Sequence, residues 1–301
     1  MRRAAHMLLP LLAATALAGC GGLDKEGMVL FTDEGHSVTL LGASGDGFVV
    51  PDGLAWSKGR LYLADEGGSA VRAWAAGTKM PPLADARSGL KSPEDLVVDE
   101  GGRLFFTDDD SGGVWQVQAG GTARRIAGPK EGLGSTEGIA LAPSGALLVG
   151  DGTKHRVVSV DAEGRVTDFL GPERGIGKPE SMAFDAGGNL YIADNQANIL
   201  YLLTGDGRLH RPIRDREGFS PETILYAGGV LYIADSENGK LWRYTPEDGL
   251  SVLAVFGGKL AAVHGLAADD RGSLYVSVQS DLKNKRGYLL RIDRKRAAPK
   301  R

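Results

Sequence analysis

The sequence predicts an all-β fold, a six-bladed β-propeller of four-stranded antiparallel blades. A unit of about two dozen residues recurs six times, at steps of 42 or 43 residues. The units begin at Pro51, Pro93, Thr136, Pro179, Pro221 and Val263. A fixed period of this size indicates a repeat architecture, and four short strands per repeat are typical of a propeller blade.

Each unit opens with two apolar runs joined by Gly-x-Leu. The turn glycines are Gly59, Gly102, Gly145, Gly188, Gly229 and Gly272. A glycine at this point supplies the positive φ that a tight hairpin needs, and the flanking runs are rich in strand formers. A third run follows in most units, such as 156–160, and a fourth in several, such as 166–170 and 251–256.

The two ends of the propeller are expected to meet in the sixth blade. Residues 28–42 match the third and fourth strands of a blade, so the strand near 37–42 is expected to close that blade from outside. Residues 28–33 and 287–292 both fit its third strand, and the sequence leaves this choice open. The predicted propeller spans 28–293.

The amino terminus has the pattern of a secretory signal over residues 1–19. A basic start is followed by an apolar run at 7–18, which is too short to span a membrane. Leu17-Ala18-Gly19-Cys20 resembles a bacterial lipobox, in which Cys20 receives lipid; the alternative is a signal whose cysteine is there by chance. The lipoprotein reading makes 20–27 a lipidated tether. Gly21, rather than an aspartate, then favours the periplasmic face of the outer membrane.

Composition narrows the function classes. The formal charge is −3, and the loss of Arg2 and Arg3 with residues 1–19 leaves −5, which argues against a nucleic-acid partner. Cys20 is the only cysteine, which excludes an intrachain disulfide and a cysteine-based zinc cluster. The basic tail, 294–301, is expected to be a solvated end, with contact to anionic lipid headgroups as the alternative. A monomer is expected.

The second residue of each unit should stand at the mouth of the central channel. These residues are Asp52, Glu94, Glu137, Glu180, Glu222 and His264. Two unit charges ~6 Å apart repel by roughly 3 kcal/mol at an effective dielectric of ~20, so the ring needs a cation, raised pKa values or side chains splayed into water. Carboxylates are preferred ligands of calcium, so the five acids predict a divalent-cation site. The alternative is that they cap local backbone amides.

A second row of acids ends the second strand of five units. Its members are Asp65, Asp108, Asp151, Asp194 and Asp235, and the sixth unit has Val278 there. An aspartate before a turn usually accepts hydrogen bonds from the turn backbone. A structural role is therefore predicted for this row.

The units resemble two known families. Their pattern P-x-G-[IL]-A…G-N-L-Y-[IV]-A-D…N is similar to the NHL repeat over nearly all of 51–292, and the blade count with acids at strand starts resembles the SMP-30/gluconolactonase family. The second resemblance implies one divalent ion, often calcium, at the channel mouth. Pro51-Asp52-Gly53 matches that family's aspartate ligand motif. It further implies that His264 stands in for the family's acid/base.

These features favour a metal-dependent hydrolase of lactones or related esters, with Asp52, Glu94, Glu137, Glu180 and Glu222 as ligands and His264 as the catalytic residue. The chain departs from the family in offering glutamates where the family offers asparagines, and so many anions would weaken the Lewis acidity of one ion. The alternatives are a non-catalytic NHL-type propeller that binds a protein, peptide or glycan on its top face, and a periplasmic scaffold whose ion is structural.

Overall fold

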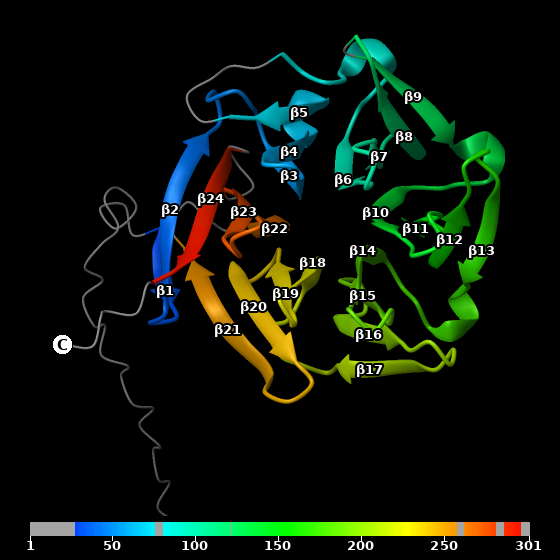
Figure 1. The fold of residues 1–301 in the computed structure, drawn as a ribbon. Coiled ribbons are helices and arrows are strands. Elements are labelled where there is room, and N and C mark those ends of the chain that lie inside the picture. The colour runs from blue at the N-terminus through cyan, green and yellow to red at the C-terminus, as the bar shows by residue number, and fades with distance from the viewer. Residues whose placement is uncertain (1–27, 76–80, 121, 258–261, 281–285, 296–301) are drawn as a thin grey trace, which may run out of the picture.

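The protein is a six-bladed propeller in a computed structural model that describes residues 28–75, 81–120, 122–257, 262–280 and 286–295. Six antiparallel sheets stand around a central channel (Figure 1). The predicted fold class is therefore confirmed. The predicted signal peptide and tether, with Cys20, and the last six residues of the basic tail lie outside the described residues.

The blades follow one another along the chain. Blades one to three contain β3 (Pro51–Ser57), β4 (Arg60–Asp65), β5 (Ala70–Trp74); β6 (Pro93–Val98), β7 (Leu104–Asp108), β8 (Gly113–Gln118), β9 (Thr122–Ala127); and β10 (Thr136–Leu141), β11 (Leu147–Asp151), β12 (Arg156–Val160), β13 (Val166–Leu170). Blade four contains β14 (Pro179–Phe184), β15 (Leu190–Asp194), β16 (Ile199–Leu203) and β17 (Leu209–Ile213). Blade five contains β18 (Pro221–Ala227), β19 (Val230–Asp235), β20 (Lys240–Thr245) and β21 (Gly249–Phe256), with β1 (Val29–Thr32) at its edge. Blade six contains β22 (Ala262–Ala268), β23 (Leu274–Gln279), β24 (Gly287–Arg294) and β2 (His36–Ala43). Short 3-10 helices connect or end some blades, at η2 (Glu66–Gly68), η3 (Ala86–Ser88), η4 (Pro129–Glu131) and η5 (Pro172–Arg174).

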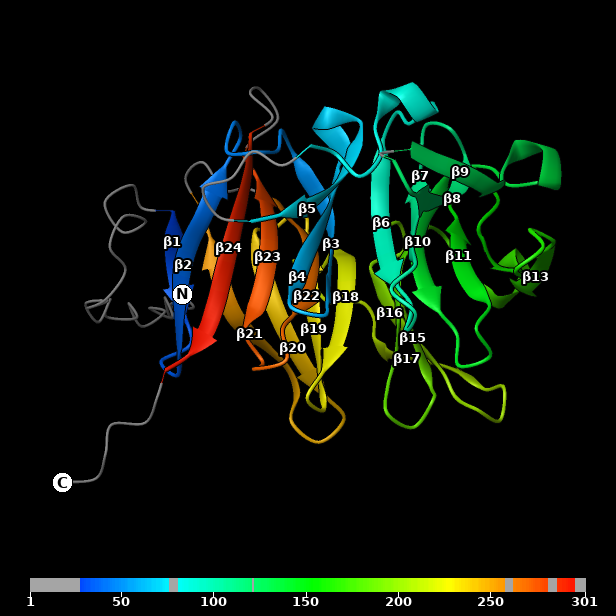
Figure 2. The ribbon, with the colours of Figure 1, turned by 45° about the horizontal axis from the view of Figure 1, so that its top comes forward.

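The inner strands β3, β6, β10, β14, β18 and β22 line the channel (Figures 1 and 2). Each touches the next around the ring, and β22 touches β3 to close it. The six predicted turn glycines all have positive φ, between 77° and 87°. The turns therefore form as the Gly-x-Leu pattern predicts, and they place the start of every inner strand at one mouth of the channel and its end at the other.

The structure decides which terminal segment completes which blade. β24 is the third strand of the sixth blade, and β2 pairs with it as the predicted outer strand. β1 pairs instead with β21, as a fifth strand of the fifth blade. The two candidates for one position thus occupy different blades, and β24 ends at Arg294, one residue past the expected boundary of the propeller.

The first blade departs from the four-stranded expectation. Its described part forms three strands, and the segment that follows β5 makes only an isolated bridge between Val71 and Ala84. The second, third, fourth and sixth blades have four strands each. None of the described helices is long and apolar enough to cross a bilayer.

Apolar side chains packed between neighbouring sheets form the core. One cluster joins the third and fourth blades and includes Leu148, Met182 and Tyr201; another joins the first two and includes Phe106. Burial of such large apolar side chains stabilises the fold by about 1.5–3 kcal/mol each. This packing fixes the blades relative to one another and so fixes the ring of strand starts.

Candidate functional site

The channel mouth at the starts of the inner strands gathers all six predicted residues within electrostatic reach of one another. Their backbones pack tightly, because small residues follow them in neighbouring strands. A Cβ at Gly53, Gly138 or Gly265 would collide with the carbonyl oxygen of Glu94, Glu180 or Asp52, respectively. Close approach of the strands thus brings the side chains of the ring together.

Asp52 and His264 form a buried pair. His264 Nδ1 lies 3.3 Å from Asp52 Oδ2, and Gln279 Nε2 donates to the same oxygen at 3.5 Å. Burial alone would lower the pKa of His264, but the adjacent carboxylate of Asp52 outweighs it and raises the pKa to about 9. His264 therefore carries a proton and a positive charge at neutral pH.

Glu137 and Glu180 share a lysine. Lys178 Nζ lies 3.1 Å from Glu137 Oε2 and 2.8 Å from Glu180 Oε1. Burial alone would lower the pKa of Lys178, but these two carboxylates raise it above its usual value. Ser135 Oγ donates to the other oxygen of Glu137 at 3.0 Å. Lys178 is thus a protein-borne counter-charge inside the ring.

Glu222 and Glu94 differ in their partners. Glu222 Oε2 accepts hydrogen bonds from Asn195 Nδ2 at 2.9 Å and from Ser236 Oγ at 2.8 Å. No hydrogen bond or ion pair reaches the Glu94 carboxylate from the residues that the structure describes. Burial, then the charges of Asp52 and the other ring acids, raise the pKa of Glu94 well above its usual value. Glu94 is therefore the ring acid that most needs a proton or a cation.

Sequence reasoning missed an outer rim of polar residues. The residues after Asp65, Asp108, Asp194, Asp235 and Val278 border the ring, whereas the third unit has Gly152 at this position. The five bordering residues are Glu66, Asp109, Asn195, Ser236 and Gln279. Side chains alternate along a strand, so the residue after a core-facing aspartate points the other way, and this alternation is the signal that could have found the rim. Burial and the nearby Glu137 raise the pKa of Asp109 to about 6.

Lys178 could also have been singled out from the sequence. It precedes the fourth unit, and the five other residues at this position are neutral: Val50, Ser92, Ser135, Ser220 and Ala262. A single charged residue at a neutral position of the repeat is not required by the blade. It is therefore a candidate for a role specific to the channel mouth.

The second row of acids is structural, as predicted. Its five members are fully buried. Asp194 is typical: its carboxylate accepts the backbone N–H groups of Gly177 at 2.6 Å, Lys178 at 3.0 Å and Ala197 at 2.9 Å. These bonds tie the turn after the second strand to the segment that leads into the inner strand of the same blade.

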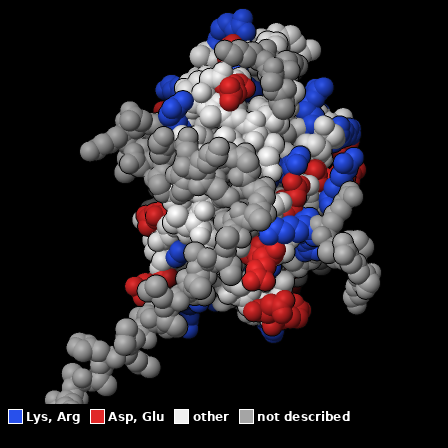
Figure 3. Space-filling model, turned by 90° about the vertical axis from the view of Figure 1, so that its left-hand side faces the viewer, with Lys and Arg blue, Asp and Glu red and all other residues white. Residues whose placement is uncertain are grey.

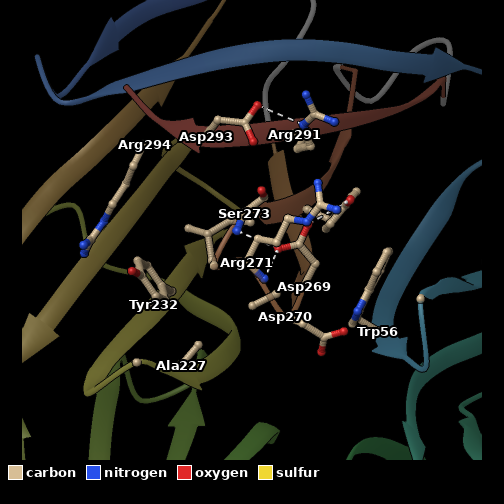
Figure 4. Close-up of a pocket in the computed structure, with 16 residues that line it drawn as sticks. Trp56, Ala227, Tyr232, Asp269, Asp270, Arg271, Ser273, Arg291, Asp293 and Arg294 are labelled. Carbon is tan, nitrogen blue, oxygen red and sulfur yellow. Dashed lines mark hydrogen bonds and ion pairs between the residues drawn. The ribbon is translucent and has the colours of Figure 1, made fainter. Parts of the chain in front are cut away.

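Two hollows lie away from the ring. The channel interior holds about 330 Å³ and is lined mainly by apolar residues of the inner strands. A larger hollow of about 1060 Å³ lies at the opposite mouth, around the hairpin of the sixth blade (Figure 4). Several of its charges have local partners: Asp269 accepts the amides of Arg271 and Ser273, and Arg291 pairs with Asp293. We therefore place the candidate site at the acid ring, despite the greater size of this hollow.

The donor set of the ring suits a hard divalent cation, because carboxylate oxygens predominate. The uncompensated carboxylate of Glu94 fits such an ion. Among the described residues, however, no three His, Cys, Asp or Glu side chains already surround a common point as a metal site. Three of the ring carboxylates instead lie against cationic side chains: Glu137 and Glu180 against Lys178, and Asp52 against His264.

Comparison with solved structures shows the same fold in proteins of different function. A gluconolactonase from Xanthomonas campestris is 16% identical, with a TM-score of 0.69 over 92% of this chain and 94% of that one. A catalytically inactive histidine-to-alanine variant of virginiamycin B lyase from Staphylococcus aureus, with quinupristin, is 12% identical, with a TM-score of 0.58 over 85% and 99%. A nidogen/laminin complex contains a chain that is 21% identical, with a TM-score of 0.61 over 73% and 84%.

No curated protein matches the chain. The family profile described as SMP-30/Gluconolactonase/LRE-like region matches residues 23–214, which is well over half of the sequence. The expected resemblance to this family is thereby confirmed. The chain belongs to the SMP-30/gluconolactonase/LRE-like family, and its fold is a propeller of the lactonase-like kind.

Proposed function

We propose that the protein hydrolyses lactones or related small esters at the acid ring, with the help of a divalent cation, most simply calcium. The observation that carries this proposal is the carboxylate of Glu94, which lies among four other acids without a partner in the described structure. Family membership supports the reaction class. Of the five predicted ligands, Glu94 with Asp52 and Glu222 would hold the ion, while Glu137 and Glu180 face Lys178.

The bound ion would polarise the ester carbonyl and stabilise the negative charge that develops on its oxygen. The residues of the ring supply the proton chemistry. Asp52 holds the Nδ1 side of His264, so the second proton of the imidazolium is on Nε2. When water attacks the ester carbon, its proton would pass to a ring carboxylate, and when the C–O bond breaks, Nε2 would give its proton to the departing alkoxide oxygen. His264 is thus the proposed catalytic acid.

A direct assay tests this function. Full-length protein is stripped with a chelator, supplied with calcium, magnesium, manganese or zinc in turn, and mixed with five- and six-membered lactones and simple esters while acid release is followed. We expect hydrolysis that needs the ion and that falls about a hundredfold in His264→Gln, within the usual range for loss of a general acid. Absence of hydrolysis with every ion would refute the proposal.

A non-catalytic role on the same face is the second candidate. Lys178 and the Asp52–His264 pair already neutralise much of the ring, and the fold is shared with a chain in the nidogen/laminin complex. The ligand would be a protein, peptide or glycan on the face that carries the ring. A lack of both ion binding and hydrolysis, together with ligand binding that the Glu137→Gln/Glu180→Gln double variant abolishes, would favour this candidate.

We further propose that lipid on Cys20 anchors the protein to the outer membrane, on its periplasmic face. Cys20 itself lies outside the described residues. Support comes from β1, which begins nine residues after Cys20 and exposes Leu30 and Phe31 by 63% and 47%. The side of the molecule that carries β1 and β2 is seen in Figure 3. Cys20→Ser should move the protein from the membrane fraction to the soluble fraction; a variant that still pellets with membranes would contradict the anchor.

A further inference from the structure

Lys178 joins two neighbouring blades through its ammonium group. Its Nζ bridges Glu137, on β10, and Glu180, on β14, at 3.1 and 2.8 Å. The two oxygens that it contacts, Glu137 Oε2 and Glu180 Oε1, are buried, and no other donor of the described residues reaches them. The ammonium is therefore the only described positive charge in contact with these two acids.

The backbone holds this lysine in place. Its N–H donates to Asp194 at 3.0 Å, and Pro179 follows directly and starts β14. A proline restricts the residue before it to an extended conformation. The backbone of Lys178 is thus fixed beside the channel mouth, in part by its hydrogen bond to Asp194 of the second row.

The repeat shows that the blade itself does not require a charge here. The equivalent residues of the other five units are small or apolar and uncharged, as given above. The positive charge occurs in this one unit only and contacts two ring acids, so we relate it to the ring and not to the folding of the blade.

We propose that the Lys178 ammonium is a tethered counter-cation, which permanently fills the Glu137–Glu180 side of the channel mouth and restricts a divalent ion to the side of Glu94. This inference deepens the proposed function and rests on it for the ion at Glu94. It makes Lys178 a positioning residue: it determines how many cations the ring accepts and which carboxylates remain free to bind one.

The test compares calcium titration by calorimetry with the melting temperature of the full chain, in chelator and in calcium. In Lys178→Met the two freed carboxylates should take up calcium, either as one additional ion per chain or as an affinity at least tenfold higher. In chelator its melting temperature should fall by roughly 5–10 °C, because two buried carboxylates lose their partner, and calcium should restore it.

Two matched variants separate charge from packing. Lys178→Arg keeps the positive charge and should behave as wild type. Lys154→Met removes a lysine whose Nζ donates to the carbonyl of Gly132 and not to a ring acid, and it should leave calcium binding unchanged. A wild-type isotherm for Lys178→Met, with a rise of its melting temperature in calcium no larger than that of wild type, would overturn the proposal.

The outcomes also separate this inference from the hydrolase. If wild type binds no divalent ion but Lys178→Met binds calcium, the tethered cation stands and the metal-dependent function falls. If Lys178→Met does not fold in either buffer, the Lys178→Met/Glu180→Gln variant decides, since it removes one of the two stranded charges. Recovery of its melting temperature would support the counter-cation, and lack of recovery would show that the lysine acts through packing.

Discussion

Two rows of acids in the same propeller obtain their partners in different ways. The second row, at the ends of the second strands, accepts bonds from backbone amides of the segment that leads into the same blade, and these bonds recur from blade to blade. The ring at the channel mouth bonds to individual side chains that do not recur: Lys178, His264, Asn195, Ser236 and Gln279. Glu94 has no described partner at all.

The difference distinguishes contacts that maintain each blade from contacts that belong to the candidate site. A partner that recurs with the repeat serves the blade, because every blade needs the same turn. A partner that occurs once serves the place where the blades meet. We therefore expect the second row to control stability and the ring to control the binding of cations, with the two effects separable by mutation.

The largest effect on stability is expected in the second row. Asp194→Ala would leave three partly buried backbone N–H groups without their acceptor, which should lower the free energy of unfolding by about 3 kcal/mol. Thermal denaturation measures this, with the exposed Asp270→Ala as a control that should change it by less than about 0.5 kcal/mol. Equal melting temperatures for the two variants would show that the second row is not structural.

The opposite sign is expected at the ring. Glu94→Gln removes a half-buried carboxyl group that lies close to four other ring acids, so in chelator at pH 8 it should raise the free energy of unfolding by about 1 kcal/mol. Denaturant unfolding in chelator and in calcium would record the effect. A loss of stability comparable to that of Asp194→Ala would erase the distinction between the two rows.

The pH dependence of stability should also come from the ring. The pKa of His264 is about 9 in the folded protein, against 6.5 for the unfolded chain, so the folded state binds more protons between these values. Its contribution is fully present below about pH 6.5 and is lost as the pH rises through 9, a decrease of roughly 3 kcal/mol. Burial and the other ring acids raise the pKa of Glu180 as well, which acts in the same direction.

Denaturant unfolding at several pH values between 6 and 10 checks this prediction. His264→Gln should flatten the decrease. A wild-type stability that stays level or rises over this interval would contradict the protonated state assigned to His264.

The smallest effect on stability is expected for the rim. Ser236→Ala removes one donor to Glu222, which keeps Asn195, so unfolding should change by less than about 1 kcal/mol. Calcium affinity should nevertheless fall by about tenfold, because the donor orients a proposed ligand. Calorimetry compares it with Ser144→Ala, in an exposed turn. An unchanged affinity would remove the rim from the site.

The fold could be predicted because each repeat contains the residues that determine its own strands and turns. Gly-x-Leu sets every hairpin, and the strand-end aspartates bond within reach of their own turn, so local sequence was sufficient. The placement of β1 could not be predicted, because a third strand has the same pattern in any blade. Closure of the ring of blades decided that β24 takes the sixth blade.

The ring positions could be predicted from their place in the repeat, whereas their partners could not. Lys178 reaches Glu137 from the next blade, and Asn195 reaches Glu222 across 27 positions. Such contacts depend on how far a side chain extends between blades, which no single unit encodes. One of these contacts could have been suspected from the sequence, because Lys178 is a charged residue at an otherwise neutral position of the repeat.

The most direct test of the claim that the ring serves a cation is calcium titration by calorimetry on the full chain after chelator treatment, with the melting temperature recorded alongside. We predict one binding site in wild type, a higher melting temperature with calcium, and loss of both in Glu94→Gln. Absence of binding by calcium, magnesium, manganese and zinc, with an unchanged melting temperature, would contradict the account.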